Sequence, residues 1–382
     1  MDSDKSFRNL PRGIAGLINV TKPHVPELER LIPLLEEIWA SGIFTNGGQK
    51  HRDLEEALAL TFGLPNVSLF CNATIALMVA QRCLGVKGKV ITTAYSFVAT
   101  SHALTWMHNE PIFVDIEPDS LCIDPEKIEA AITDDTVAIM PLHCYGNVCD
   151  TAAISVIAKR YGLKVIYDAC HSFGVQDEGG SALRHGDASA VSFHATKVFN
   201  TLEGGMLVTS TPVIKAKVDK LKNFGFTGET SVIEVGLNGK MSEFNAAIGL
   251  LQLQDLEAVL LKRRLIDAKY RELLDGVPGI SCLKPVRQKK RNYAYFPIFV
   301  DKQYGISRDT LYELLKRHGV HGRRYFHPLI SDFPMYKDLP SATESNLPVA
   351  RSAADSVICL PIYPDLALDE AARICEIIRR GE

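Results

Sequence analysis

An alternation of short β-branched runs with segments of helical period, between residues 67 and 209, constrains the fold of this chain more than any other feature. This order is typical of an α/β chain in which helices cover a mostly parallel sheet. Strands are predicted over residues 67–70, 89–92, 111–115, 137–141 and 164–168, and a hairpin over residues 189–193 and 205–209. Helices are predicted between them over residues 74–84, 97–107, 125–132 and 151–161.

The length of 382 residues predicts one large domain and one smaller domain, because a single core rarely grows this far. A long helix over residues 242–274 is expected to link them. We expect a large domain over residues 1–255 and a small C-terminal domain over residues 256–382. The small domain draws on predicted elements at residues 295–300, 308–318 and 369–380. A helix over residues 26–41 precedes the first strand, and packing on the small domain is one position open to it.

Composition and charge exclude several classes of protein. The 42 basic and 45 acidic residues leave a formal charge of -3 without a basic block, which argues against nucleic-acid and anionic-membrane partners. The first 22 residues lack the apolar core of a signal peptide, and no apolar stretch approaches the length of a membrane span, so a cytoplasmic protein is expected. Nine cysteines without a C-x-x-C pair favour reduced thiols over a disulfide framework or a zinc site, and no metal is predicted.

The ends of three predicted strands carry groups that could bind a ligand or react with one. Ligands of doubly wound sheets bind beyond such ends. Residues 71–74 run from a strand directly into a helix, whose free N–H groups can hold a phosphate; ordinary capping is the alternative. Asp168 ends an apolar strand, where its carboxylate would suit a cofactor ring nitrogen, a helix cap or the surface. Lys197 lies between a strand and a Gly-Gly turn, where burial would favour loss of its proton and imine formation. Most lysines, in contrast, are solvated charges.

The motifs around these groups extend over nearly the whole chain. They lie at residues 18–23, 41–47, 72–77, 95–100, 236–243 and 359–364, in addition to the Asp168 and Lys197 motifs. Together they resemble pyridoxal-phosphate enzymes of the aspartate aminotransferase fold (fold type I), and within them the DegT/DnrJ/EryC1/StrS sugar aminotransferase family. The resemblance implies an α/β large domain with a mostly parallel seven-stranded sheet and a smaller C-terminal α/β domain. It also implies pyridoxal 5′-phosphate as cofactor, with pyridoxamine 5′-phosphate as its second form.

The resemblance makes Lys197 the Schiff-base lysine and Asp168 the partner of the pyridine nitrogen. Asp168 then keeps that nitrogen protonated, so that the ring accepts an electron pair, and Lys197 moves the substrate proton. Further cofactor contacts are implied at the phosphate for Ala73, Thr74 and Ser192, at the ring face for Phe97, and at the ring edge or phenolic oxygen for His171. The family commonly has glycine at the position of Ala73, and this small side chain is expected to fit. From composition alone, Phe97 is a core residue.

Asn238 reaches, in the family, the phosphate held by the neighbouring subunit. The resemblance therefore implies a homodimer with composite active sites; the alternative is a turn residue beside Gly236 and Gly239. Substrate contacts are suggested for Thr45, Lys240, Tyr325 and His327. The spacing from Tyr325 to Leu329 departs from the family pattern, which weakens the case for His327.

The reaction implied by the resemblance is transamination. Dehydratases of the family use a histidine in place of the Schiff-base lysine, and this chain has Lys197 there. The amino group would pass from L-glutamate to a nucleotide-linked keto-deoxysugar. Overall likeness favours dTDP-4-keto-6-deoxyglucose, giving dTDP-4-amino-4,6-dideoxyglucose for deoxysugar, O-antigen and lipopolysaccharide biosynthesis. A 3-keto acceptor and a non-catalytic regulator that keeps the fold are the alternatives.

Overall fold

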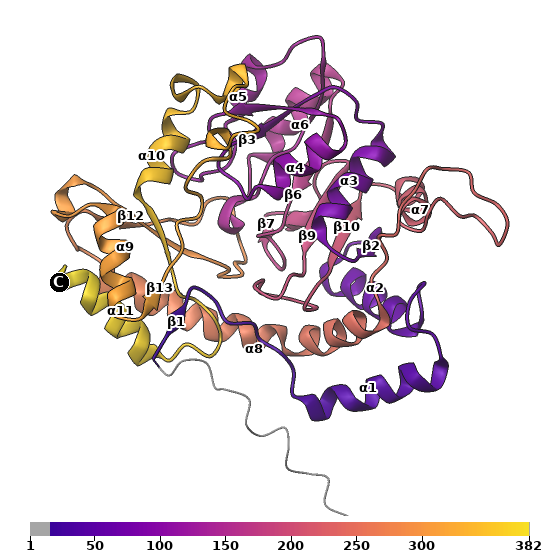
Figure 1. Cartoon of the computed structure of the whole chain (residues 1–382), viewed down its shortest axis with the longest axis horizontal. Coiled ribbons are helices and arrows are strands. Elements are labelled where there is room, and N and C mark those ends of the chain that lie inside the picture. Colours follow the sequence, from indigo (N-terminus) through magenta and orange to yellow (C-terminus); the bar gives the residue numbers. More distant parts are fainter. Residues whose placement is uncertain (1–15, 382) are drawn as a thin grey trace, which may run out of the picture.

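Seven strands form one central sheet in the computed structural model, which describes residues 16–381 (Figure 1). In chain order they are β2 (Val67–Phe70), β3 (Lys89–Thr93), β4 (Glu110–Val114), β5 (Thr136–Ile139), β6 (Lys164–Asp168), β9 (Ala188–Ser192) and β10 (Gly205–Thr209). Their order across the sheet is β2-β10-β9-β6-β5-β3-β4. Neighbours are parallel except at β10, which is antiparallel to β2 and β9. The predicted seven-stranded, mostly parallel sheet is confirmed, as is the antiparallel pairing of its last two strands.

The helices between these strands begin and end at residues with strong local preferences. α3 (Ala73–Leu84) begins after Asn72, whose side chain accepts the N–H of Ile75, and it ends at Gly85 with a left-handed φ of 71°. A polar side chain satisfies a free N–H group at a helix start, and glycine adopts the left-handed conformation at low cost. α6 (Thr151–Tyr161) is bounded by an aspartate and a glycine in the same way.

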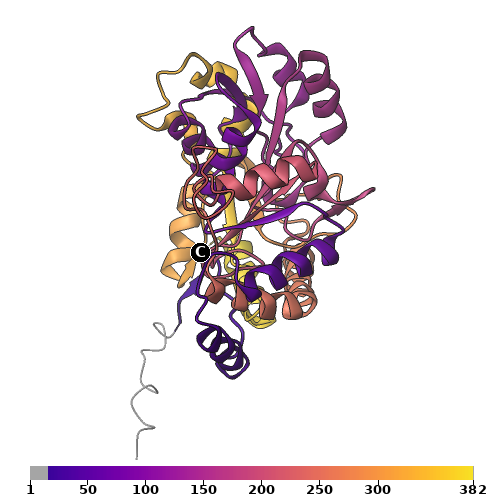
Figure 2. The ribbon, with the colours of Figure 1, turned by 90° about the vertical axis from the view of Figure 1, so that its right-hand side faces the viewer.

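Helices cover both faces of the sheet. α3, α4 (Ala99–Trp106) and α7 (Pro212–Leu221) pack on one face, whereas α2 (Gln49–Phe62) and α8 (Glu243–Leu274) pack on the other. Seen after a turn of 90°, α7 crosses in front of the strands (Figure 2). The sheet is therefore the middle one of three layers, and helices bury both of its faces.

Two of these helices, α2 and α7, were not predicted from the sequence. The only apolar side chains of α2 that are fully buried are Leu54 and Leu58, one helical turn apart, and charged residues flank Leu54. Such a narrow apolar stripe gives a weak periodic signal.

α8 joins the large sheet to a smaller one. It begins after Ser242, whose side chain accepts the N–H of Asn245. The first half of α8 packs under the central sheet, and its second half packs on an antiparallel sheet of three strands. That sheet contains β11 (Ile280–Cys282), β12 (Phe296–Val300) and β14 (Val357–Leu360), and α9 (Arg308–Arg317) and α11 (Leu368–Arg380) cover it.

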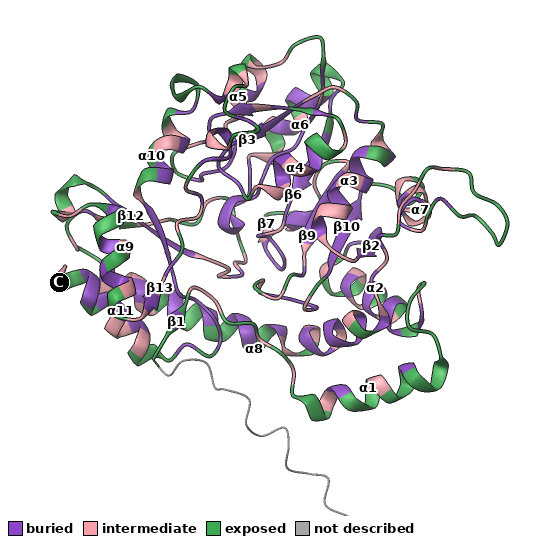
Figure 3. Ribbon diagram, viewed as in Figure 1, coloured by how far each residue is buried: buried purple, intermediate pink, exposed green. Residues whose placement is uncertain are grey.

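By length and composition alone α8 is apolar enough to cross a membrane. Half of its most apolar 18-residue window is buried inside the protein, however, as in the core helix of a folded domain. Figure 3 shows buried residues, in purple, recurring along the length of α8 between exposed ones. Most of its large apolar residues therefore have partners within the chain, whereas Phe244, Leu261 and Leu265 are exposed.

The C-terminal part contributes to both cores. After β13 (Val320–His321) the chain returns to the large sheet, where Phe326, Leu329 and α10 (Pro348–Ser356) pack in the cluster that also contains β4 and α6. It then enters β14 in the smaller sheet. A domain division at residue 255 would fall inside the unbroken helix α8, and it stays a prediction.

The N-terminal helix α1 (Leu28–Ser41) lies along the lower edge of the molecule in both views (Figures 1 and 2). Its buried side chains Leu31 and Ile38 contact the first half of α8, and Arg30 forms an ion pair with Asp255 at 2.8 Å. α1 therefore does not pack on the small domain, which was left open above. It packs on α8, which buries the apolar side of α1. Only the short strand β1 (Ile18–Asn19) pairs with β13 of the smaller unit.

Candidate active site

A cavity of about 340 Å³ lies beyond the carboxyl ends of β2, β6 and β9. Its volume is in the range of small-molecule and cofactor sites. Seven of the eight predicted cofactor residues line it: Ala73, Thr74, Phe97, Asp168, His171, Ser192 and Lys197. The sheet therefore brings together groups that are as far as 124 positions apart in the sequence, between 73 and 197.

The start of α3 forms one wall of the cavity. The N–H groups of Ala73 and Thr74 belong to the first helical turn and have no acceptor within the helix. A Cβ atom at Gly205 would lie 2.8 Å from the nitrogen of Ala73, so glycine is required for β10 to pass this close. Ser192, at the end of β9, contributes a hydroxyl to the same cavity. Free N–H groups at the positive end of a helix dipole suit a phosphate.

Asp168 ends β6 and is only 4% exposed. One carboxylate oxygen accepts the hydroxyl of Thr100 at 2.7 Å, and the other accepts the N–H of Cys170 at 3.1 Å. Within residues 16–381 no basic side chain lies within ion-pair distance of Asp168. A buried carboxylate that faces a cavity without a cationic partner fits a protonated ring nitrogen.

Lys197 follows β9 and reaches into the cavity. Its Nζ donates a hydrogen bond to the phenol of Tyr295 at 3.1 Å. Burial acts to lower the pKa of Lys197, but Tyr295, Cys170 and Asp168 act to raise it, and the net pKa lies above the ordinary value. The expectation that burial alone would release the proton is therefore wrong, because polar neighbours outweigh desolvation. Lys197 must lose a proton before it acts as a nucleophile.

His171 is buried beside Lys197. Its Nδ1 accepts the backbone N–H of Tyr145 at 3.1 Å, so the neutral ring carries its proton on Nε2. Burial, followed by the charges of Lys197 and His143, lowers the pKa of His171 well below its ordinary value. The ring also stacks on Phe326, with centroids 5.9 Å apart and planes at 5°. His171 thus offers the site a neutral N–H donor.

Four predicted site residues lie outside the lining of this cavity in the described chain: Thr45, Asn238, Lys240 and His327. Asn238 forms a bridge with Asn223 at the base of a loop, and Lys240 places its Nζ 4.6 Å from the ring centroid of Phe224. Tyr325, the remaining predicted substrate residue, does line the cavity. The roles of all five stay predictions.

Two functional neighbours, Thr100 and Tyr295, were missed by the sequence analysis. Thr100 lies in the quoted motif at residues 95–100, but its partner Asp168 is 68 positions away. Tyr295 lies 98 positions from Lys197. No local spacing signals such contacts, since the packing of α4 and of the smaller sheet creates them.

Known proteins similar to this chain include sugar transaminases. The chain is 51% identical to the dTDP-4-amino-4,6-dideoxy-D-glucose transaminase of Shigella dysenteriae, over 95% of this chain and 98% of that protein. The enzyme of the same name from Escherichia coli is 48% identical, over 94% and 98%.

Solved structures show the same fold. DesI, crystallised in the presence of its TDP-sugar product, has a TM-score of 0.91 and 34% identity, over 96% of this chain and 93% of that one. NtdA from Bacillus subtilis, with bound cofactor PMP, has a TM-score of 0.83 and 30% identity, over 92% and 82%. The fold is that of the fold-type-I aminotransferases, as expected.

The residues of the cavity fit pyridoxal phosphate. The start of α3 suits the phosphate, the unpaired carboxylate of Asp168 suits the ring nitrogen, and the amine of Lys197 suits the aldehyde. The family model described as the DegT/DnrJ/EryC1/StrS aminotransferase family matches residues 27–379. The chain is therefore a pyridoxal-phosphate-dependent aminotransferase and belongs to the DegT/DnrJ/EryC1/StrS aminotransferase family.

Proposed function

We propose that this protein transfers the amino group of L-glutamate to dTDP-4-keto-6-deoxyglucose and forms dTDP-4-amino-4,6-dideoxyglucose. One observation carries the proposal: Lys197, Asp168 and the start of α3 line one cavity. Identity of 51% to a transaminase named for this product supports the choice of sugar. The TDP-sugar product present with DesI supports a nucleotide-linked substrate.

Each type of group in the cavity has a task in this reaction. Bound pyridoxal phosphate supplies a carbonyl carbon that carries the amino group and a ring that accepts an electron pair. The first turn of α3 and Ser192 bind the phosphate. Asp168, oriented by Thr100, holds a proton on the ring nitrogen. Phe97 lines the cavity with a side chain that is 59% exposed, so its ring is free to cover one face of a planar ligand.

Lys197 has two tasks in the proposed mechanism. Its neutral amine would hold the cofactor at the carbonyl carbon, with loss of water, and the same amine, when free, would carry a proton away from the substrate carbon. Both tasks need the same atom, Nζ, within reach of the cofactor. His171 contributes its Nε2–H as a neutral donor, since burial lowers its pKa well below the ordinary value.

A second copy of the chain would complete the site. Large apolar side chains are exposed at the end of α1, beside the cavity, and in the loop before Asn238. They are Trp39, Ile43, Phe44, Phe97, Phe224, Phe226, Val232, Ile233, Val235 and Phe244. Exposed apolar clusters of this kind mark interfaces. In the homodimer that we propose, this loop reaches the partner's cavity and brings Asn238 and Lys240 to the phosphate end.

The other substrate contacts are also part of the proposal. Thr45 lies in the loop between α1 and α2, and Glu243 fixes both ends of the segment that follows it: its N–H donates to the carbonyl of Phe44 in the loop, and its carboxylate accepts the N–H groups of Lys50 and His51 in the first turn of α2. Thr45 is thus presented by an ordered loop beside the exposed apolar cluster. Tyr325 meets the sugar from within its own chain. His327, which lies 3.6 Å from Asp355, has the weakest geometric support.

We place the reaction in the cytoplasm and assign its product to O-antigen and lipopolysaccharide biosynthesis. A nucleotide-linked sugar carries two phosphate charges and does not cross a bilayer unaided, so the enzyme must share its compartment. The pathway is proposed from the comparisons alone, because both relatives are named for the sugar dTDP-4-amino-4,6-dideoxy-D-glucose.

One experiment separates the proposal from its alternatives. The purified protein in its pyridoxamine form is presented with 3-keto and 4-keto dTDP-sugars, and the product is identified by NMR. We expect amination at C4. Amination at C3 would favour the 3-keto alternative, and a folded, cofactor-bound protein without turnover would favour a regulator.

A further inference from the structure

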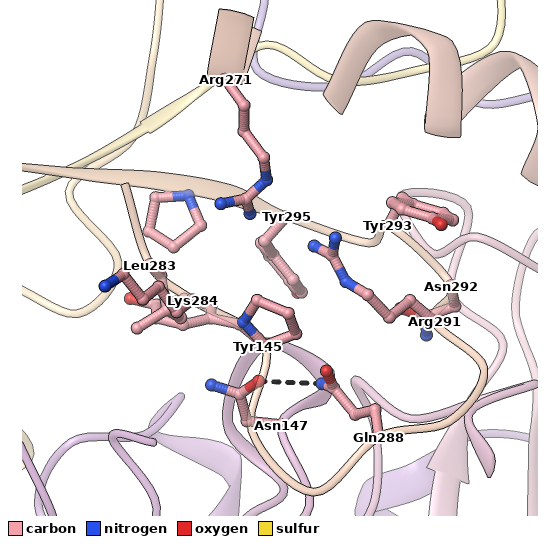
Figure 4. Close-up of a pocket in the computed structure, with 12 residues that line it drawn as sticks. Tyr145, Asn147, Arg271, Leu283, Lys284, Gln288, Arg291, Asn292, Tyr293 and Tyr295 are labelled. Atoms are coloured by element: carbon pink, nitrogen blue, oxygen red, sulfur yellow. Dashed lines mark hydrogen bonds between the residues drawn. The ribbon is translucent and has the colours of Figure 1, made fainter. Parts of the chain in front are cut away.

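Tyr295 connects the catalytic lysine to the smaller sheet. It directly precedes β12, and its phenol oxygen lies 3.1 Å from Nζ of Lys197. The ring lines the cofactor cavity and also a second, small cavity beside Arg271 and Tyr145 (Figure 4). Tyr295 is thus a lining residue shared by the two cavities.

The segment that carries Tyr295 is anchored on the loop that follows Asp168. Asn292 is 2% exposed, and its amide donates to the carbonyls of His171 at 2.8 Å and Phe173 at 3.0 Å. The amide oxygen accepts the N–H of Ala294 at 3.2 Å. The Tyr295 ring packs on His171 with centroids 4.6 Å apart. These contacts hold the phenol in a set place relative to the loop after β6.

The phenol of Tyr295 is the one hydrogen-bond partner of the Lys197 amine in the part of the chain that the structure describes. A phenol oxygen accepts a hydrogen bond more strongly from an ammonium group than from a neutral amine, so Tyr295 holds the amine of Lys197 best in its charged form. We propose that Tyr295 is a positioning residue that holds the amine of Lys197 whenever this amine is not bonded to the cofactor. The inference rests on the proposed function, in which Lys197 bonds to the cofactor carbonyl.

Several other charged or titratable groups face this pair. Those that act on Lys197 are Asp168, Cys170 and His171, and those near Tyr295 are Cys170, Arg263, Tyr325 and Cys359. Removal of the phenol oxygen leaves all of them in place. It removes one acceptor that favours the charged amine, so the neutral amine becomes easier to form.

The test uses the full chain freed of cofactor. Pyridoxal phosphate is added at a series of pH values, attachment is trapped with borohydride, and the modified residue is located by mass spectrometry. For Tyr295→Phe we expect the midpoint of attachment to move to lower pH, with attachment at neutral pH faster by about threefold to tenfold. Tyr145→Phe is the matched control, because it removes a buried hydroxyl that bonds Tyr95 at 2.8 Å and the carbonyl of Tyr325 instead of Lys197. Its midpoint should equal that of the wild type.

Tyr295→His is a second variant, which keeps a ring and an acceptor nitrogen and should return the midpoint toward the wild-type value. A folded Tyr295→Phe protein with a wild-type midpoint, or a midpoint at higher pH, would overturn the inference. Attachment at another residue, or undiminished attachment in Lys197→Ala, would instead overturn the assignment of Lys197 and with it the proposed function. The two failures are therefore distinguishable.

Discussion

The two halves of the proposed active site differ in how much of them one chain completes. The strand-end half, formed by α3, Asp168 and Lys197, encloses a cavity and orients its polar groups within a single chain. The loop that carries Asn238 and Lys240 is rimmed by exposed apolar side chains and lines no part of its own chain's cavity in the described residues. The first half is preorganised by the sheet, whereas the second half would act only in the homodimer that we propose.

The largest effect expected is that of Lys197→Ala. Without the amine, the protein should lose multiple turnover by roughly a thousandfold or more, because both the nucleophile and the proton carrier are gone. Pyridoxal phosphate should still bind through the start of α3 and Asp168, but borohydride should no longer attach it to the chain. Mass spectrometry after reduction measures this. A variant that is still labelled would contradict the role of Lys197.

A smaller but still severe loss is expected for Asp168→Asn. The amide keeps the shape of the side chain and still meets the hydroxyl of Thr100, but it lacks the charge that holds a proton on the ring nitrogen. We expect turnover to fall roughly a hundredfold to a thousandfold with little change in the melting temperature. Thr100→Val is the matched control, since it removes one hydrogen bond and keeps the charge. Near-normal turnover by a folded Asp168→Asn protein would mean that another group serves the ring.

The same contrast explains how far the sequence alone predicts this molecule. The strand over residues 164–168 and the turn before α3 depend on local patterns, and both were predicted at their observed positions. The hydrogen bonds from Thr100 to Asp168 and from Lys197 to Tyr295 span 68 and 98 positions. Side chains from distant elements complete them, so no pattern of spacing contains them.

Long-range packing also accounts for the two expectations that failed. The amphipathic pattern of α1 shows that one side is buried, but not that α8 covers it. The apolar surroundings of Lys197 predict a lowered pKa, but the phenol that reverses the shift arrives from the smaller sheet. In both cases the property predicted from the local sequence was correct, and a contact with a distant part of the same chain decided the outcome.

Mixing two defective chains tests most directly whether the loop that carries Asn238 acts in the partner's site. If Asn238 serves the partner's site, a Lys197→Ala chain and an Asn238→Ala chain place both lesions in one site of the mixed dimer and leave the other site intact. Co-expression with different tags and isolation of the mixed dimer should then restore about half of the wild-type activity, provided that the sites act independently. If Asn238 serves its own chain, each site of the mixed dimer keeps one lesion. Its activity then stays near that of the two single-variant homodimers.

The smallest effect is expected within the preorganised half, at His171. Its pKa is lowered well below the ordinary value by burial and by the charges of Lys197 and His143, which favours the neutral ring. His171→Gln replaces a neutral N–H donor with another neutral N–H donor. We therefore expect kcat/KM to fall by less than about tenfold, as for loss of geometry in one hydrogen bond. The acid limb of its pH profile should stay where it is. Disappearance of that limb in a folded variant would show that His171 titrates during the reaction although it is buried.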